Sequence, residues 1–292
     1  MSKISIDIGG TYIRAAFFDE TCEMNEIQKE RTVRGKECDG LLDQIERMAI
    51  SYIEKGAVRM GIGVPGVVDH CGKIKYAANI PELENMNLGE LMQKRLKIPV
   101  NTINDANAAA LAEAVLGAGK GYRSVYYITV STGIGGGLVI DRKIWTGSAG
   151  YAGEAGGVLT GRKGGLCAES VEISASGSAL TKIGSAVLGR RLKDAGEVLS
   201  ASLHGEPWAV ALSEQMVYEL ATLCADISYI VNPDIFVFGG GCMSSAYPLL
   251  KKIHNQYMQL TDEGLHDTKF AQAVLNEPGV VGVAIYNYRK GD

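Results

Sequence analysis

The chain has 292 residues, of which 46% are hydrophobic and 21% are charged, and its formal net charge is −4. This length favours two domains over one. The acidic balance leaves no basic face for a nucleic acid backbone, so we exclude nucleic acid as a partner. We find neither a signal peptide nor a membrane span. The six cysteines form no CxxC pair, which suits a reducing compartment, and we expect a cytoplasmic protein.

Strands and helices alternate through the first third of the chain, which is typical of an α/β fold. The predicted elements there are strands over 3–8, 12–18 and 23–32, a helix over 40–54, a strand over 58–64, a helix over 88–97, a strand over 99–103 and a helix over 106–116. Further on, the pattern predicts strands over 124–131, 136–141 and 235–239, a long helix over 207–231 and a closing helix over 280–290.

Two stretches resemble each other. IDIGGT at 6–11 and VSTGIGGG at 130–137 each place a glycine turn between two apolar strands. A duplicated domain, each half opening with a β-hairpin, is the simplest explanation. We therefore predict an N-terminal domain over 1–116, completed by the C-terminal helix 280–292, and a second domain over 117–279.

Two familiar phosphate-binding motifs can be set aside. Every Gly-Lys pair is followed by Glu, Ile or Gly, never by the Ser or Thr of a P-loop. The stretch Gly61–Gly66 matches the dinucleotide fingerprint of an NAD-dependent dehydrogenase. However, Pro65 and the residues after it predict a turn and a hairpin, whereas that fingerprint must open a helix.

The stretch IPVNTINDANAAALAEAV predicts a strand that ends in Asn104 and Asp105, followed at once by an alanine-rich helix. Either side chain could simply cap that helix. Alternatively, Asp105 is a carboxylate at the carboxyl end of a strand, where α/β sheets bind ligands, and takes a proton from a substrate hydroxyl. The pattern alone does not separate these interpretations.

Six motifs in order make the chain similar to the ROK family of bacterial sugar kinases and sugar-responsive repressors. The motifs are Asp7-Ile-Gly-Gly-Thr11, Gly63-Val-Pro-Gly66-Val-Val-Asp69, Asn104-Asp105-Ala-Asn-Ala-Ala, Ser131-Thr-Gly-Ile-Gly-Gly-Gly137, Ala152-Gly-Glu154-Ala-Gly and Asn232-Pro-Asp-Ile-Phe-Val-Phe-Gly-Gly-Gly241. The resemblance implies two actin-like (RNase H-like) α/β domains with a cleft between them, a homodimer, and transfer of the ATP γ-phosphate to the 6-hydroxyl of a hexose.

The resemblance also implies roles for individual residues. Asp105 is then the general base, and Asp7 lies near Mg²⁺. The residues implied to hold the phosphates are Gly9, Gly10, Thr11, Thr132, Gly133 and Gly135, with Gly239 and Gly240 beside adenosine. Those implied to hold the sugar are Gly66, Asn79, Asn104, Asp105, Glu154 and Glu172. Carboxylates and amides suit this task, because sugar hydroxyls both donate and accept hydrogen bonds.

The glycine-rich segment between Glu154 and Glu172 departs from the family pattern. Many members carry there a histidine and three cysteines that hold a structural zinc ion. The corresponding positions here are Gly157, Lys163, Gly165 and Ser170. Since the one cysteine nearby cannot make a tetrahedral site, we expect no zinc. The missing histidine also leaves the sugar open, with glucose or an N-acylhexosamine such as N-acetylmannosamine as candidates.

Three alternatives stand beside the kinase. Repressors of the family carry a helix-turn-helix ahead of the first motif, whereas six residues precede Asp7 here, which disfavours a DNA-binding regulator. A catalytically silent sugar sensor is disfavoured by the presence of Asp105 together with both glycine turns. The NAD-dependent dehydrogenase rests only on the fingerprint already set aside.

Overall fold

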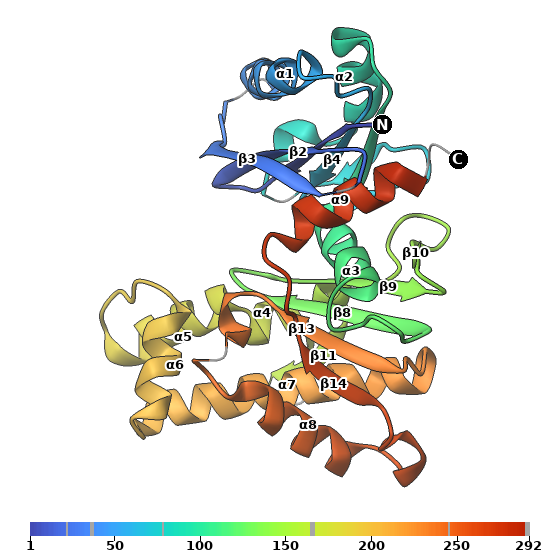
Figure 1. The fold of residues 1–292 in the computed structure, drawn as a ribbon. Coiled ribbons are helices and arrows are strands. Elements are labelled where there is room, and N and C mark those ends of the chain that lie inside the picture. Colours follow the sequence, from blue (N-terminus) through green and yellow to red (C-terminus); the bar gives the residue numbers. More distant parts are fainter. Residues whose placement is uncertain (22, 36–37, 78, 164–166, 245, 290–292) are drawn as a thin grey trace. The chain divides into compact units, whose positions relative to one another are not determined.

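The computed structural model describes the whole chain except residues 22, 36–37, 78, 164–166, 245 and 290–292 (Figure 1). The chain forms two compact units. The first comprises Met1–Leu116, Lys143–Ala152 and Leu275–Asp292, and the second comprises Gly117–Arg142 and Gly153–Val274. Residues 143–152 and 275–279, which we had assigned to the second domain, group with the first unit.

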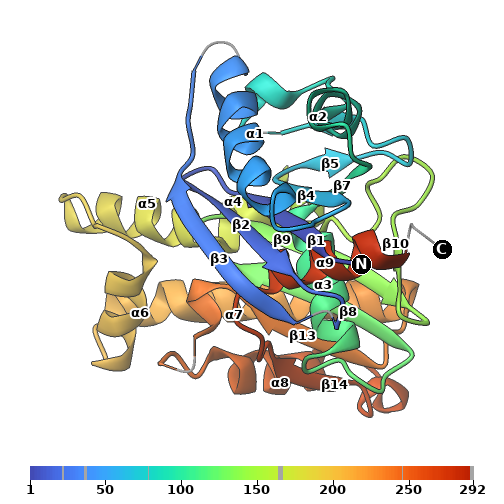
Figure 2. The ribbon, with the colours of Figure 1, turned by 45° about the horizontal axis from the view of Figure 1, so that its top comes forward.

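The first sheet has the strand order β3-β2-β1-β4-β7. Its strands are β1 (Lys3–Ile8), β2 (Tyr12–Phe18), β3 (Met24–Arg31), β4 (Met60–Val64) and β7 (Val100–Asn104). Strand β1 pairs antiparallel with β2 and parallel with β4, which in turn pairs parallel with β7. Figure 2 shows β3, β2 and β1 side by side. The carboxyl ends of β1, β4 and β7 therefore meet at one edge of the sheet.

Helices cover both faces of this sheet. They are α1 (Asp39–Ile53), α2 (Leu88–Leu96), α3 (Asp105–Val115) and α9 (Pro278–Arg289). Ile4, Ile6 and Ile8 of β1 share a buried cluster with apolar side chains of α1 and α2. The alternate residue Ser5 donates its hydroxyl to the carbonyl of Val280 in α9. Because strand side chains alternate between faces, Asp7 lies on the α9 side; α9 lies opposite α1 and α2 (Figure 1).

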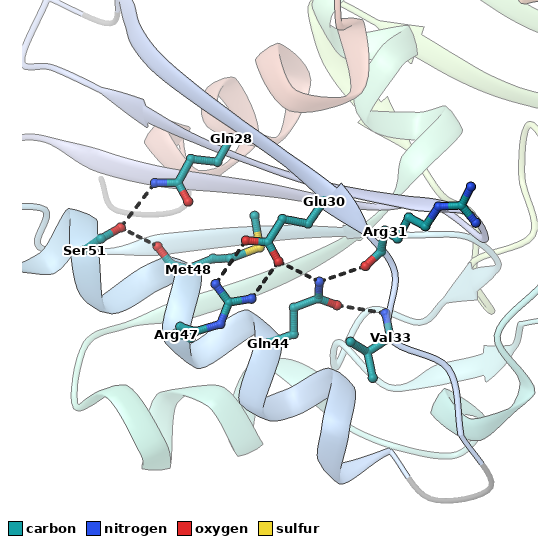
Figure 3. A network of polar contacts seen from close by, with 8 residues as sticks. All are labelled: Gln28, Glu30, Arg31, Val33, Gln44, Arg47, Met48 and Ser51. Carbon is teal, nitrogen blue, oxygen red and sulfur yellow. Dashed lines mark hydrogen bonds and ion pairs between the residues drawn. The ribbon is translucent and has the colours of Figure 1, made fainter.

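A polar network joins β3 to α1 (Figure 3). The buried Gln44 accepts from the Val33 amide at 2.9 Å and donates to the Arg31 carbonyl at 2.9 Å. Arg47 of α1 forms an ion pair with Glu30 of β3. This network fixes the position of the chain at the end of β3, where Thr32 contacts the β1–β2 turn.

The second sheet has the order β10-β9-β8-β13-β14. Its strands are β8 (Ser124–Val130), β9 (Ile134–Ile140), β10 (Lys143–Trp145), β13 (Ile235–Gly239) and β14 (Lys269–Gln272). Strand β8 pairs antiparallel with β9 and parallel with β13, which pairs parallel with β14. This order and these directions repeat those of the first sheet, so the predicted duplication, with a hairpin opening each half, is confirmed.

The helices of the second unit enclose one large apolar core, in which Phe236 of β13 packs against Tyr126 and Tyr257. The helices are α4 (Val171–Ala175), α5 (Gly177–Leu188), α6 (Ala195–Leu203), α7 (Pro207–Ile230) and α8 (Leu249–Leu260). Short elements complete the description: β5 (Val67–Val68), β6 (Ile74–Tyr76), η1 (Pro81–Leu83), η2 (Ala155–Gly157), β11 (Leu159–Lys163), β12 (Cys167–Ser170), η3 (Gly241–Met243) and η4 (Glu263–Leu265).

The predicted strands and helices appear within a few residues of their expected bounds, whereas α4, α5, α6, α8 and β14 were not predicted. The dinucleotide-like stretch is followed by the antiparallel hairpin β5–β6, not by a helix, so the dehydrogenase interpretation is wrong. Among the described residues, no helix combines the length and the apolar character needed to cross a membrane.

Candidate active site

The junction of β7 and α3 carries the two residues whose roles the sequence left open. The Asn104 side chain accepts from the Asn107 amide at 2.7 Å and is therefore the helix cap. Asp105 begins the helix, and its Oδ1 accepts from the Ala106 amide at 2.8 Å. Its carboxylate thus lies at the helix N-terminus, whose partial positive charge stabilises an anion. Asn104 is thus the N-cap, and the Asp105 carboxylate accepts from a second amide of the first turn.

Gly66 is tied to Asn104 by a hydrogen bond, in which the Asn104 Nδ2 donates to the Gly66 carbonyl at 2.8 Å. Gly66 has φ +122°, and an added Cβ would meet the Tyr76 carbonyl oxygen at 2.0 Å. Only glycine lets the chain leave β4 so close to β6. The amide of Asn104 and the backbone of Gly66 are therefore brought together at the edge where β4 and β7 end.

Asp7 ends β1 at the same edge, and its side chain keeps 15% of its surface exposed. Burial raises the pKa of Asp7 to about 6; the nearby Arg14 lowers it in part and Glu277 raises it further. Arg14 on β2 is paired in register with Asp7, and the Arg14 Nη1 lies 3.6 Å from the Asp7 Oδ2. Arg14 also pairs with Glu277, with 2.7 Å between Nε and Oε2.

The surroundings of Asp7 suit a hard cation on one side of the carboxylate. A Cβ on Gly279 would lie 3.1 Å from the carboxylate carbon, so only a glycine at the start of α9 leaves this room. A partly exposed carboxylate beside a glycine is an oxygen donor of the kind Mg²⁺ prefers. Asp7 therefore fits the role of a magnesium carboxylate, directly or through water.

Backbone hydrogen bonds and the Thr32 hydroxyl hold the turn between β1 and β2 in place. The Gly9 amide donates to the Tyr12 carbonyl at 2.9 Å, and the Thr32 hydroxyl donates to the Gly9 carbonyl at 2.6 Å. The Thr32 amide donates to the Thr11 carbonyl at 3.0 Å. Gly10 and Thr11 remain exposed, and Gly10 approaches the exposed Asn79, since an added Cβ would lie 3.5 Å from its Cβ. The network of Figure 3 thus positions the strand end that supports this turn.

The second unit repeats this arrangement at the β8–β9 turn (residues 131–133). The Ser131 amide donates to the Gly133 carbonyl at 2.9 Å, and Thr132 is exposed. Gly240, which follows β13, has φ +90°, and a Cβ there would lie 2.3 Å from the Val130 carbonyl. The end of β13 therefore lies against the end of β8, next to the β8–β9 turn.

A cavity of about 700 Å³ begins at this turn. Its walls include Thr132, Ser178, Lys182, Gly241, Cys242 and Tyr247. This volume is in the range of small-molecule and cofactor sites. Thr132, which the sequence singled out, lines the cavity, and Gly240 directly precedes Gly241 in its wall. Lys182 and Tyr247 were missed, because nothing in their local sequence marks them.

Glu154 and Glu172 interact electrostatically within the second unit. Burial raises the pKa of Glu154 to about 7, and the charge of Glu172 adds to this shift. Glu154 Oε1 is buried and has no hydrogen-bond partner among the described residues. Glu172 is exposed, and its Oε2 accepts from the Ile134 amide at 2.9 Å. An unpaired buried carboxyl oxygen suits a hydroxyl ligand, since buried polar atoms are normally hydrogen-bonded.

The expected absence of zinc stays a prediction. Gly165 lies outside the described residues, and of Lys163 only the backbone is described. Gly157 forms part of η2, and Ser170 ends β12. Within the described part of the chain, no group of three or more His, Cys, Asp or Glu side chains could hold a metal ion.

The site residues thus fall into two groups, one in each unit. In the first unit, Asp7, Gly66, Asn104 and Asp105 lie at the carboxyl ends of neighbouring parallel strands, and Gly10 lies beside Asn79. In the second unit, Glu172 contacts the β8–β9 turn, which lies beside the end of β13. Sequence reasoning missed Arg14 and Glu277. The hairpin register would have indicated Arg14, because it faces Asp7 across the predicted turn.

The chain is similar to known proteins over nearly its whole length. The model of the ROK family matches residues 3–289. The chain is 28% identical to a glucokinase from Thermotoga maritima, over 97% of this chain and 96% of that one. It is 32% identical to an N-acetylgalactosamine kinase, AgaK, from a Shewanella species, over 85% and 86% of the two chains.

A solved structure of a ROK family glucokinase from Streptomyces griseus, in complex with glucose and AMPPNP, superposes with a TM-score of 0.77. It is 28% identical and covers 99% of this chain and 100% of that one. The expected actin-like fold is therefore confirmed. With a family model that spans nearly the whole chain and a duplicated sheet of the same fold, this chain belongs to the ROK family.

Proposed function

We propose that the protein is an ATP-dependent sugar kinase that transfers the γ-phosphate to the 6-hydroxyl of a hexose or an N-acylhexosamine. The observation that carries this proposal is the β7–α3 junction. Asn104 caps the helix and holds Gly66, and the next residue, Asp105, places a carboxylate at the sheet edge where ligands bind. The names of the relatives, glucokinase and N-acetylgalactosamine kinase, support the same class of reaction.

In this mechanism Asp105 accepts the proton of the sugar 6-hydroxyl as that oxygen bonds to the γ-phosphorus. The bond from the γ-phosphorus to the β-phosphate oxygen breaks, and ADP leaves with the electron pair. Such transfers depend mostly on positioning and on neutralising charge. Asp7 would hold Mg²⁺, which supplies positive charge to the phosphates when bound. The residues proposed to bind the phosphates are Gly9, Gly10, Thr11, Thr132, Gly133 and Gly135.

The sugar would be held by carboxylates, amides and the Gly66 backbone, and the adenosine by the glycines at the end of β13. The proposed sugar residues are Gly66, Asn79, Asn104, Asp105, Glu154 and Glu172, and the proposed adenosine residues are Gly239 and Gly240. Glu154 suits a sugar hydroxyl because its pKa of about 7 lets it donate or accept near neutral pH. Glucose and N-acetylmannosamine are our leading substrates.

The proposal is tested by coupled ADP release with Mg-ATP against glucose, mannose, N-acetylmannosamine, N-acetylglucosamine, N-acetylgalactosamine and fructose. We expect turnover of one or two of these sugars and no bound zinc on metal analysis of the same sample. Sugar binding without ADP release across the panel would instead indicate a sensor and would refute the kinase. Light scattering of the same sample tests the homodimer, which stays a prediction.

A further inference from the structure

The β8–β9 turn is held in place by the segment that follows the glycine-rich loop. The Gly177 amide donates to the Ser131 carbonyl at 2.8 Å, and the Ser178 amide donates to the Thr132 carbonyl at 3.0 Å. These two contacts fix the first half of the turn through its carbonyl groups. The second half is held differently, by a side chain.

That side chain is Glu172, whose Oε2 accepts from the Ile134 amide at 2.9 Å. A carboxylate that accepts a backbone N–H forms a charge-assisted hydrogen bond, which is stronger than a neutral one. Two glycines lie close to the Glu172 carboxylate. A Cβ on Gly133 would lie 2.6 Å from Glu172 Oε2, and one on Gly156 would lie 3.4 Å from the same atom. The carboxylate therefore occupies a space that glycines at 133 and 156 leave for it.

We propose that Glu172 is a positioning residue for the nucleotide, because its carboxylate sets the conformation of the turn that receives the phosphates. This inference rests on the proposed function, which assigns the turn to phosphate and Glu172 to the sugar. It adds that one oxygen of Glu172 braces the phosphate turn. The other oxygen is the one left for a sugar hydroxyl, so a single side chain joins the two binding sites.

The brace predicts an effect that a sugar-binding residue alone would not have. Without Oε2, the Ile134 amide loses its acceptor and the turn loses its contact with the Glu172 side chain, so its N–H groups no longer point in fixed directions. Nucleotide binding should then weaken even when no sugar is present. Glu154 provides the matched control, because it is the neighbouring acid assigned to the sugar but forms no hydrogen bond with the turn among the described residues.

The test is calorimetric titration of a non-hydrolysable ATP analogue with Mg²⁺, without sugar, into the wild-type protein and three variants. We expect Glu172→Ala to weaken the affinity by about tenfold or more, the usual scale for a lost charged hydrogen bond. Glu172→Gln, whose amide oxygen can still accept from Ile134, should stay within about threefold of wild type. Glu154→Ala should stay within about twofold, while both alanine variants lose affinity for the sugar.

A double-mutant cycle with Gly133→Ala provides a second measurement. Its Cβ pushes the Glu172 carboxylate out of place, so this change should cost less nucleotide affinity in the Glu172→Ala background than in wild type. If the alanine variant does not fold, Glu172→Asp replaces it in both experiments, because its side chain is one methylene shorter.

The outcomes separate the two proposals. Unchanged nucleotide affinity in a folded Glu172→Ala protein, or full additivity in the cycle, would overturn the brace and leave the kinase intact. A wild-type protein that binds the analogue but phosphorylates no sugar would refute the kinase, while the variants still decide the brace. A wild-type protein that binds no nucleotide would refute both.

Discussion

Replacing Asn104 by alanine removes two interactions that organise the candidate base. One is the helix cap, the 2.7 Å bond from the Asn107 amide, and the other is the 2.8 Å bond to the Gly66 carbonyl. A lost cap costs about 1 kcal/mol, and the second bond contributes about 1 kcal/mol in a buried setting. Since Asn104 is 5% exposed, water replaces neither fully. We expect the free energy of unfolding of the first unit to fall by about 2 kcal/mol.

Two further variants divide this loss between its causes. Asn104→Ser keeps an acceptor for the Asn107 amide but lacks a donor for Gly66, so it should lose about half as much. Asn104→Asp also keeps the cap but places a second oxygen against the Gly66 carbonyl, and it should be less stable than the serine variant.

The assay is urea unfolding at pH 7, with hydrogen exchange at the Asn107 amide as the local readout. Faster exchange in the alanine variant than in the serine variant would match the cap assigned here. Equal stability of the alanine, serine and wild-type proteins would refute the reasoning, because neither bond would then contribute.

Three further predictions follow from other residues. Asp105→Asn should lower the phosphorylation rate by about 10²-fold or more while calorimetry still detects sugar binding, and a variant with near-full turnover would contradict the base. Gly66→Ala should destabilise the protein by more than about 2 kcal/mol, because the added Cβ clashes with the backbone in addition to the strain of the positive φ. The control Gly56→Ala has φ +95° but no atom within 4 Å of the added Cβ, so it should cost only about 1 kcal/mol. Equal losses in urea unfolding would argue against the clash. Glu154 has a pKa of about 7 in the folded protein, above its ordinary value of 4.5, so the folded protein holds an extra proton between these pH values and loses stability as the pH rises through them. Glu154→Gln should therefore flatten the dependence of unfolding free energy on pH between about 5 and 8, and an unchanged slope would show that this carboxyl titrates normally.

Local pattern was sufficient for much of the fold. The alternation of Ile4, Ile6 and Ile8 predicted a strand, and the glycine turns predicted the two hairpins. Pro65 and the residues after it were enough to reject the dinucleotide fingerprint, because they predicted a hairpin where the fingerprint requires a helix. The second unit was harder. Helix α5 contains Gly177 and Gly184, and α6 is only nine residues long, so local propensity favours these helices weakly and they depend on packing in the core.

The sequence by itself determined the duplicated α/β fold, the order of the motifs and the placement of Asp105 at the end of a strand, because these follow from residues close together in the chain. Only the tertiary structure decided that Asn104 holds Gly66, that Glu277 joins Arg14 beside Asp7, and that Glu172 supports the β8–β9 turn. These contacts join residues of different elements, most of them far apart in the chain. Local propensity carries no information about such pairs, which form only when distant strands and helices pack around a shared core.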